Sequence, residues 1–311
     1  MKIAFLFPGQ GSQTVGMGKE IYDSYQEARD IYEKASKILQ KDIAKLCFES
    51  EQEELNKTEN AQIAILVTSL AILEVLKKKG IKADICTGLS LGEYTALIYS
   101  GYLNFEEGIR LIQKRGYYMG NEIPNEKFKM VAVMGLESST IENVCKNFEA
   151  QGKFVVPANY NYSGQTVISG NEDAVEEAKV ELQKQGAKKL VDLKTSGPFH
   201  TKKLETAKAK FALELAKVNF NKGEILVIKN ADGSFYKVED NIRDILENHM
   251  VNPVRFDKTI QKMQEENIDI YVEVGPGKAL SSFVKKENKE ANTINICNME
   301  TLQNALEILK P

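Results

Sequence analysis

The chain has 311 residues, enough to bury substantial cores in one large domain or two domains. Its formal net charge is −3 and its composition is ordinary for a globular protein, so no basic field points to nucleic acid. The four cysteines are far apart and only two histidines are present, so we expect neither a disulfide framework nor a metal site, and a reducing cytoplasm fits.

The chain begins with a short apolar segment at residues 3–7, which ends at a Pro-Gly turn. This segment is too short for the core of a signal peptide and predicts a buried strand. The most apolar stretch, residues 61–76, includes the polar residue Gln62 and stops at three lysines and Gly80. Cations and glycine suit the end of a helix, so we expect a buried helix and no membrane span.

The next elements are a buried strand at residues 84–87 and two helices. One helix begins near Leu91, and a longer one runs from Phe105 to about Gly120. Polar residues around Pro124 then mark a boundary.

The segment 127–196 has a different order of predicted strands and helices. Strands are predicted at 130–134, 154–158, 166–169 and 189–193, and helices at 138–151 and 173–185. The order β-α-β-β-α-β is the signature of a ferredoxin-like unit. We therefore expect residues 127–196 to form a small domain inserted into a large domain made of residues 1–126 and 197–311.

The large domain is expected to resume with an amphipathic helix at residues 204–218. Short apolar strands follow at 225–228, 270–274 and 293–296, with helices between and after them. Strands that alternate with helices predict an α/β fold with a parallel sheet.

Residues 88–92 read Gly-Leu-Ser-Leu-Gly, between the predicted strand and the predicted helix. This matches the G-x-S-x-G pattern of a nucleophile elbow, a sharp turn that projects the Ser90 hydroxyl above the edge of the sheet. Glycine is needed on both sides because strand and helix leave no room for a Cβ atom. The alternative is a Gly-rich turn with an idle serine, but the flanking strand and helix favour a nucleophile.

A serine needs a base to become a nucleophile, and the two histidines are His200 and His249. His200 follows a rigid Gly-Pro-Phe turn, and His249 ends a predicted helix. Spacing slightly favours His200 as the base and leaves His249 open. No Asp stands out as a third member of a triad, so a backbone carbonyl could orient the imidazole instead.

Motifs spread nearly end to end resemble those of one family, the malonyl-CoA:acyl carrier protein transacylases with the acyltransferase domains of fatty acid and polyketide synthases. The matching segments are residues 7–13, 88–94, 115–116, 158–161, 164–165, 197–200, 252–254 and 274–277. The resemblance implies a hydrolase-like parallel-sheet α/β domain with an inserted ferredoxin-like domain, in agreement with the elements predicted above.

The resemblance also implies the catalytic roles. Ser90 would carry the acyl group, and His200 would act as general base and acid. The backbone carbonyl of His249 would orient the His200 imidazole. The backbone N–H groups of Gln10 and Leu91 would form the oxyanion hole.

Four further positions would bind the substrate if the resemblance holds. Arg115 would hold the malonyl carboxylate, because its planar fork suits a planar anion. On its own, Arg115 would read as a solvated charge on a helix. Phe199 would favour malonyl over the bulkier methylmalonyl group, and Asn159 and Asn161 would contribute to the pocket.

Three positions depart from the family pattern. Leu89 stands where His is frequent, which removes a polar neighbour of Ser90. His249 stands where Gln is common and places a second imidazole near the site. Tyr162-Ser163 replaces the usual Ser-Pro and changes the local turn.

The implied reaction is ping-pong transfer of malonyl from malonyl-CoA to the phosphopantetheine thiol of acyl carrier protein, for fatty acid synthesis. It needs no metal or redox cofactor. Lysines near His200 suggest a docking patch for the acidic carrier protein, with a solvated helix face as the alternative; they are Lys188, Lys189, Lys202, Lys203, Lys208 and Lys210. We expect a cytoplasmic monomer without nucleic-acid or membrane partners.

Other functions share parts of this pattern. A serine esterase or thioesterase could use the same elbow, although Arg115 and the lack of an acidic triad member argue against it. A polyketide-pathway acyltransferase could take another acyl-CoA. A non-catalytic subunit that binds carrier protein is disfavoured by the presence of Ser90, His200 and Arg115.

Overall fold

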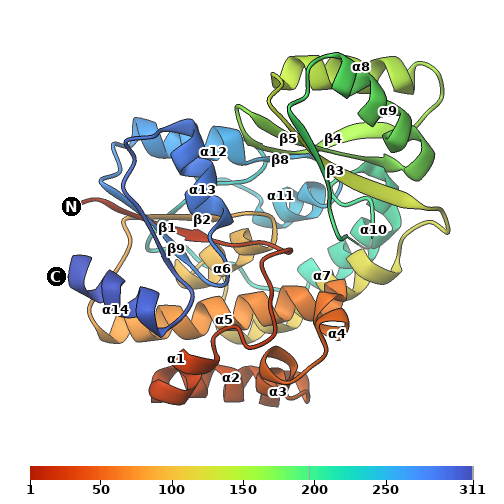
Figure 1. The fold of residues 1–311 in the computed structure, drawn as a ribbon. Helices are drawn as coiled ribbons and strands as arrows, with labels where there is room; N and C mark the ends of the chain where they lie inside the picture. Colours follow the sequence, from red (N-terminus) through yellow and green to blue (C-terminus); the bar gives the residue numbers. More distant parts are fainter. Residues whose placement is uncertain (196, 310–311) are drawn as a thin grey trace.

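The described part of the chain forms two five-stranded sheets (Figure 1). The computed structural model describes residues 1–195 and 197–309; residue 196, at the end of the predicted insertion, and residues 310–311, at the end of the predicted large domain, lie outside this part. The strands are β1 (Ile3–Phe7), β2 (Ile85–Gly88), β3 (Phe128–Met134), β4 (Val155–Tyr162), β5 (Gln165–Asn171), β6 (Lys189–Asp192), β7 (Leu226–Val227), β8 (Val254–Arg255), β9 (Ile270–Val274) and β10 (Thr293–Ile296).

The helices surround both sheets. They are α1 (Lys19–Ser24), α2 (Gln26–Leu39), α3 (Ile43–Phe48), α4 (Gln52–Asn56), α5 (Thr58–Lys78), α6 (Leu91–Tyr99), α7 (Phe105–Asn121), α8 (Ser138–Glu149), α9 (Glu172–Lys184), α10 (Glu205–Leu215), α11 (Ile242–His249), α12 (Phe256–Glu265), α13 (Ala279–Glu287) and α14 (Met299–Ile308), with a 3₁₀ turn, η1, at Lys202–Leu204.

The first sheet is parallel throughout, with the order β10-β9-β1-β2-β7. Residues 4–7 of the central strand β1 are fully buried, as expected for a strand covered on both faces. Phe7 at the end of β1 lies opposite Gly88 at the end of β2. The segments that follow these strands, one with Gln10 and one with Ser90, therefore start at the same edge of the sheet. The predicted parallel α/β sheet is confirmed.

Helix α5 forms the floor beneath this sheet and lies between it and α1–α4 (Figure 1). In the part of the chain that is described, it is the one helix long and apolar enough to cross a membrane, but 89% of its apolar window is buried inside the protein. The expectation of a buried core helix is confirmed.

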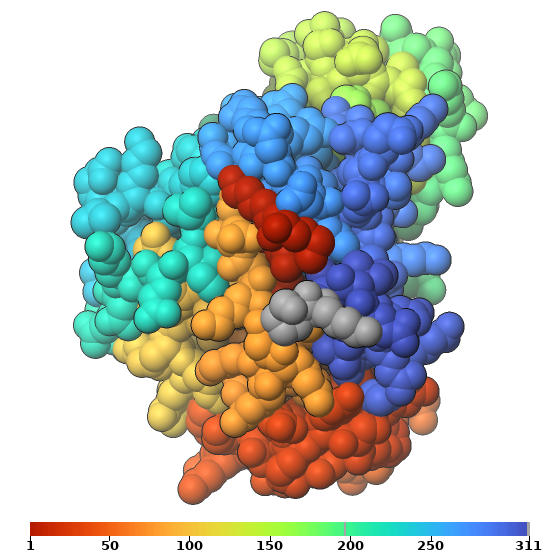
Figure 2. Space-filling view, turned by 90° about the vertical axis from the view of Figure 1, so that its left-hand side faces the viewer, coloured from red at the N-terminus to blue at the C-terminus, as the bar shows by residue number. Residues whose placement is uncertain are grey.

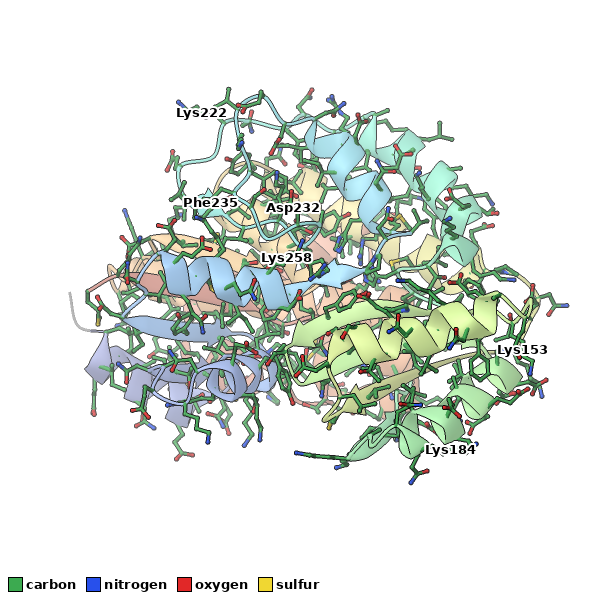
Figure 3. The ribbon with its side chains drawn as sticks, turned by 90° about the horizontal axis from the view of Figure 1, so that it is seen from above. Lys153, Lys184, Lys222, Asp232, Phe235 and Lys258 are labelled. Atoms are coloured by element: carbon green, nitrogen blue, oxygen red, sulfur yellow. The ribbon has the colours of Figure 1, made fainter. Side chains whose placement is uncertain are left out.

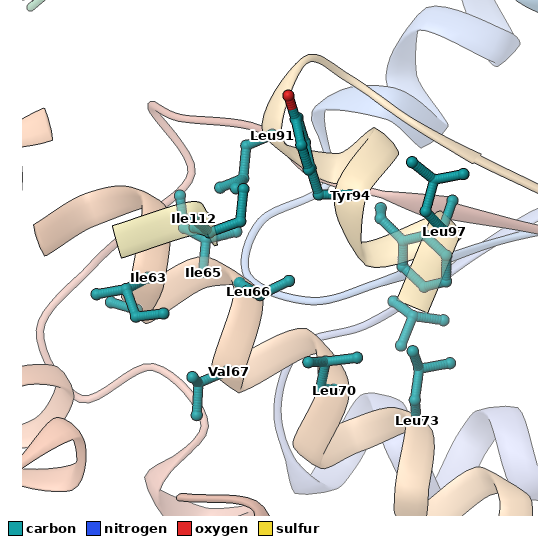
Figure 4. Packing of buried hydrophobic residues seen from close by; sticks show 14 of the residues in the cluster. Ile63, Ile65, Leu66, Val67, Leu70, Leu73, Leu91, Tyr94, Leu97 and Ile112 are labelled. Carbon is teal, nitrogen blue, oxygen red and sulfur yellow. The ribbon is translucent and has the colours of Figure 1, made fainter. Parts of the chain in front are cut away.

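The helix after the elbow, α6, is anchored on α5. Leu91, Tyr94 and Leu97 are fully buried. They belong to one cluster of buried residues with Leu66 and Leu70 of α5, and Figure 4 shows the Tyr94 side chain extending away from α5 to its hydroxyl. Apolar packing therefore fixes the start of α6, and with it the position of Ser90.

The second sheet has the order β6-β3-β5-β4-β8. Its first four strands, together with α8 and α9, follow the predicted order β-α-β-β-α-β and stand out at the upper right of Figure 2. The fifth strand, β8, was not predicted, because it has only two residues and comes from a distant part of the chain. It runs parallel to β4, with Asn159 opposite Val254, and so ties the second sheet to the segment that follows His249.

The two glycines of the elbow permit very close backbone approaches. A Cβ atom on Gly92 would lie 2.0 Å from the backbone oxygen of Phe7, and one on Gly88 would lie 2.2 Å from the carbonyl carbon of Gly92. Backbone atoms cannot rotate away as side chains can. The expectation that strand and helix leave no room for a Cβ atom is confirmed.

We predict that Gly92→Ala lowers the free energy of unfolding by about 3 kcal/mol, because overpacking against backbone must displace α6 from β1. Gly101→Ala is the matched control: its Cβ would meet nothing within 4 Å, and only the positive φ of 84° opposes it. That strain costs about 1–2 kcal/mol. Urea denaturation followed by circular dichroism measures both, and equal losses would contradict the steric argument.

Candidate active site

Ser90 sits between β2 and α6 in a strained backbone conformation, with φ 53° and ψ −98°. Strain of this kind persists where the surroundings hold it in place. The Asn230 side chain does so: its Oδ1 accepts from the Ser90 N–H at 2.6 Å, and its Nδ2 donates to the Gly88 carbonyl at 2.6 Å. The serine side chain is left half-buried and free to take other partners.

His200 is the imidazole that reaches the serine. Its Nε2 lies 2.8 Å from Ser90 Oγ, and its Nδ1 lies 2.9 Å from the His249 carbonyl oxygen. A carbonyl can only accept, so Nδ1 carries the proton and Nε2 presents a lone pair to the serine hydroxyl. His200 also has a positive φ of 59°, so both members of the pair are held in strained backbone.

The electrostatics keep this imidazole neutral. Burial, reinforced by the positive charge of Arg115, lowers the pKa of His200 to about 4. A neutral imidazole is the form that can accept a proton from serine at neutral pH.

Arg115, on α7, completes the cluster. Its side chain is almost fully buried, its Nη2 donates to Ser90 Oγ at 3.0 Å, and its carbon Cζ lies 5.1 Å from the centre of the Tyr94 ring. It forms no ion pair with the residues that the structure describes. A solvated charge on a helix surface is therefore excluded, and the guanidinium presents an uncompensated positive charge beside the serine.

Gln62 joins Arg115 to the segment after β1. Arg115 Nη1 donates to Gln62 Oε1 at 2.7 Å, and Gln62 Nε2 lies 3.5 Å from Gln10 Oε1. Gln62 was not predicted as a site residue, although an amide within a long apolar stretch indicates a position that needs a polar partner. Asn230 was also missed, and nothing in its local pattern indicated an elbow contact.

The other predicted site residues are placed less directly. Phe199 is buried beside His200 in the chain. Leu91 opens α6, where backbone N–H groups have no acceptor within the helix, and Gln10 starts from the same edge of the sheet. Asn161 donates to Gln165 Oε1 at 2.7 Å, and within residues 1–195 and 197–309 neither it nor Asn159 bonds to the serine, imidazole or guanidinium.

The positions that depart from the family pattern have structural partners. Leu89 packs against the cluster that includes Val254 and Phe256. The Tyr162 ring lies 5.7 Å from the Phe283 ring of α13. These apolar contacts explain how both residues are accommodated.

The parallel α/β fold carries a serine on an elbow, a neutral imidazole and a buried cation. Together these features are typical of the active site of an acyltransferase. Comparison with known proteins agrees, since the acyl transferase domain family matches residues 4–303. The chain belongs to this family.

Individual relatives narrow the comparison. A curated protein of Bacillus subtilis (strain 168), named malonyl CoA-acyl carrier protein transacylase, is 38% identical over 99% of this chain and 98% of its own length. The crystal structure of malonyl CoA-acyl carrier protein transacylase from Clostridium perfringens ATCC 13124 is 41% identical, with a TM-score of 0.95 over 100% of this chain and 98% of that one.

A third relative was solved as a complex. A structure of a type II polyketide synthase acyl carrier protein with its malonyl-transacylase has a chain that is 34% identical, with a TM-score of 0.95 over 99% of this chain and 100% of that one. The superpositions confirm the fold class predicted from the sequence.

We predict that neither histidine titrates near the ordinary imidazole pKa of 6.5 in the folded protein. Burial lowers the pKa of His200 to about 4 and that of His249 well below 6.5. The unfolded chain therefore takes up protons below pH 6.5 that the folded chain refuses, and the free energy of unfolding should fall as the pH drops from 6.5 toward 4.

Histidine NMR titration of the folded protein measures both imidazoles, with the urea-unfolded chain as the control. A folded-state resonance that titrates near 6.5 would contradict the burial argument.

Proposed function

We propose that the protein transfers a malonyl group from malonyl-CoA to the phosphopantetheine thiol of an acyl carrier protein, through an ester on Ser90, and supplies malonyl carrier protein for fatty acid synthesis. The observation that carries the proposal is the buried Arg115 guanidinium, 3.0 Å from Ser90 Oγ. Such a cation favours an acyl group that ends in a carboxylate. The names of the relatives and the complex with a carrier protein support it.

In the first half-reaction, His200 Nε2 accepts the Ser90 hydroxyl proton as Oγ attacks the thioester carbonyl. The developing oxyanion is bound by the backbone N–H groups of Gln10 and Leu91. The His249 carbonyl holds the protonated imidazole in place through Nδ1–H. Coenzyme A leaves as its sulfur takes the proton from His200.

In the second half-reaction, the same groups act on another thiol. The phosphopantetheine thiol gives its proton to His200 and attacks the ester carbonyl on Ser90 Oγ. The oxyanion forms again at the N–H groups, and Ser90 recovers its proton from His200. This cycle uses no metal or redox cofactor.

The substrate pocket extends from Arg115. Phe199 is proposed to limit the space at the malonyl α-carbon, which disfavours a methylmalonyl group, and Asn159 and Asn161 are proposed to line the pocket. One methyl group in such a pocket changes binding by only ~1–3 kcal/mol, so the preference is one of degree. We place the reaction in the cytoplasm and assign it to a monomer.

We predict that Arg115→Ala lowers malonyl transfer to Ser90 by about 10- to 100-fold, the equivalent of the ~1.5–3 kcal/mol that hydrogen bonds to a charged group contribute. Acetyl transfer should change much less, because an acetyl group has no carboxylate. Intact-protein mass spectrometry after timed incubation with each CoA ester measures both.

Two controls accompany this experiment. Ser90→Ala should abolish the adduct from either ester, and Arg115→Lys keeps the charge but loses the planar fork. Equal losses of malonyl and acetyl labelling in Arg115→Ala would overturn the assignment of the carboxylate site.

The lysines near His200 divide into two groups. Lys203, Lys208 and Lys210 form ion pairs with Glu126, Glu247 and Glu122 respectively. Lys188, Lys189 and Lys202 are exposed and form no ion pair with the residues that the structure describes. Of these three we propose Lys202, two residues after the base, as the lysine that meets the acidic carrier protein.

We predict that Lys202→Glu slows transfer from malonyl-enzyme to holo-carrier protein by about three- to tenfold at low salt, because a rim charge acts mainly on association. Acylation by malonyl-CoA should be unchanged. Lys184→Glu is the control, since exposed Lys184 lies on the outer side of α9 and pairs only with Glu181 of its own helix (Figure 3). Quenched single-turnover transfer from malonyl-enzyme to the carrier protein measures the effect. Equal slowing by both variants would refute the role of Lys202.

A further inference from the structure

The proposed mechanism leaves one buried carboxyl group beside the site without a role. Glu93 lies in the first turn of α6, three residues after Ser90, and its side chain is fully buried. A buried carboxyl group is costly unless its oxygens are satisfied. Its two oxygens face two different parts of the site.

The Glu93 oxygen Oε1 faces the segment that holds the elbow. It accepts from the Tyr236 hydroxyl at 2.8 Å and from the Asn230 N–H at 3.1 Å. The Asn230 side chain in turn bonds to the elbow on both sides of Leu89. Glu93 thus holds Asn230 in place, and Asn230 in turn holds Ser90.

The Asn230 segment is also held from outside. The Asn230 carbonyl accepts from the Arg255 N–H at 2.8 Å, and Gly233 lies against Lys258 of α12. The Phe235 ring of this segment, labelled in Figure 3, also meets α12, at 5.2 Å from Lys262 Nζ. These contacts fix the backbone around Asn230, so its side chain is held in position to bond to the elbow.

The other oxygen, Oε2, faces the residue that holds the base. It lies 3.2 Å from His249 Nδ1, and both side chains are 1% exposed. His249 presents its backbone carbonyl to His200, and the two imidazole rings are 4.8 Å apart between centroids. Glu93 therefore touches both the support of the nucleophile and the support of the base.

A single proton would satisfy both atoms of this contact. Neither Glu93 Oε2 nor His249 Nδ1 has a hydrogen-bond partner in the described part of the chain. Burial raises the pKa of Glu93 to about 7 and lowers that of His249. Both shifts oppose isolated charges here, even with the positive charges of Arg115 and Lys229 nearby, and favour one proton held between the carboxyl oxygen and the ring nitrogen.

We propose that Glu93 is a positioning residue that sets the distance between nucleophile and base, acting through Asn230 on one side and the His249 side chain on the other. The inference rests on the proposed roles of Ser90 and His200. Both residues have strained backbones, and a shared anchor explains how the two strained segments keep their atoms at 2.8 Å.

The test compares Glu93→Ala with Glu93→Gln. The glutamine keeps the shape, retains an acceptor for Asn230 and Tyr236, and offers an N–H to His249. Glu93→Ala should slow acylation at saturating malonyl-CoA by about 100-fold, as expected for a displaced reacting pair, while Glu93→Gln should stay within about threefold of wild type. Rapid-quench mass spectrometry measures the rates.

The Kd for malonyl-CoA distinguishes a loss of positioning from a general disruption of the site. In the Ser90→Ala background, Glu93→Ala should leave the Kd for malonyl-CoA within about twofold, because only the chemical step depends on the distance between serine and imidazole. Equal losses in Kd and rate, or a wild-type rate in Glu93→Ala, would overturn the proposal.

Glu273→Ala is the matched control. Glu273 is also buried and accepts two backbone N–H groups, from Leu280 at 3.2 Å and Ser281 at 2.8 Å, but it contacts neither elbow nor base. Its loss should cost stability and leave the acylation rate within about threefold. If it slows acylation as much as Glu93→Ala does, the effect of Glu93 is general destabilisation.

A second pair of variants keeps the test decisive if Glu93→Ala does not fold. His249→Ala retains the backbone carbonyl but removes the partner of Oε2, and should slow acylation about tenfold; His249→Gln restores a donor and should recover most of the rate. No loss in His249→Ala, or no recovery in His249→Gln, would overturn the proposal. A malonyl adduct that persists in Ser90→Ala would instead overturn the proposed nucleophile.

Discussion

The architecture of the site depends on the contact between α6 and β1. Gly92 comes so close to the Phe7 carbonyl that a methyl group in its place would overlap it. The chain leaves β2 at Gly88 and enters α6 at Leu91, with only Leu89 and Ser90 between them, and Ser90 takes the strained backbone that this turn requires. Packing of α6 on α5 maintains this contact. The hydrophobic core therefore stabilises the strained backbone conformation of Ser90.

Electrostatics follow from the same burial. Tyr94 of α6 lies against Arg115, and this desolvated guanidinium, together with burial, disfavours a protonated imidazole in the resting site. His200 is kept neutral, and the positive charge is left available for an anion. One desolvated region thus supplies both a base in the right protonation state and a preference for an acyl group with a carboxylate.

The sequence predicted the features whose causes are local. Continuous apolar runs gave the parallel strands, and the β-α-β-β-α-β order was visible because each element has its own periodicity. It missed β8, a two-residue strand paired with distant β4, and the polar contacts of Gln62 and Asn230. Gln62 meets Arg115 53 residues away, and Asn230 meets Ser90 140 residues away. No local pattern encodes such pairs, although a polar residue in an apolar context marks a position that needs a partner.

His249 shows how one residue can serve a site in two separable ways. Its backbone carbonyl orients the catalytic imidazole, and any side chain would leave that carbonyl in place. The side chain, however, faces a buried carboxyl oxygen of Glu93, where an apolar group would leave a polar atom unsatisfied. The residues tolerated here should be those that can share a proton or donate an N–H to the carboxyl group. The side chain at position 249 is thereby restricted by chemistry, because the oxygen it faces belongs to Glu93, the residue that also supports the nucleophile.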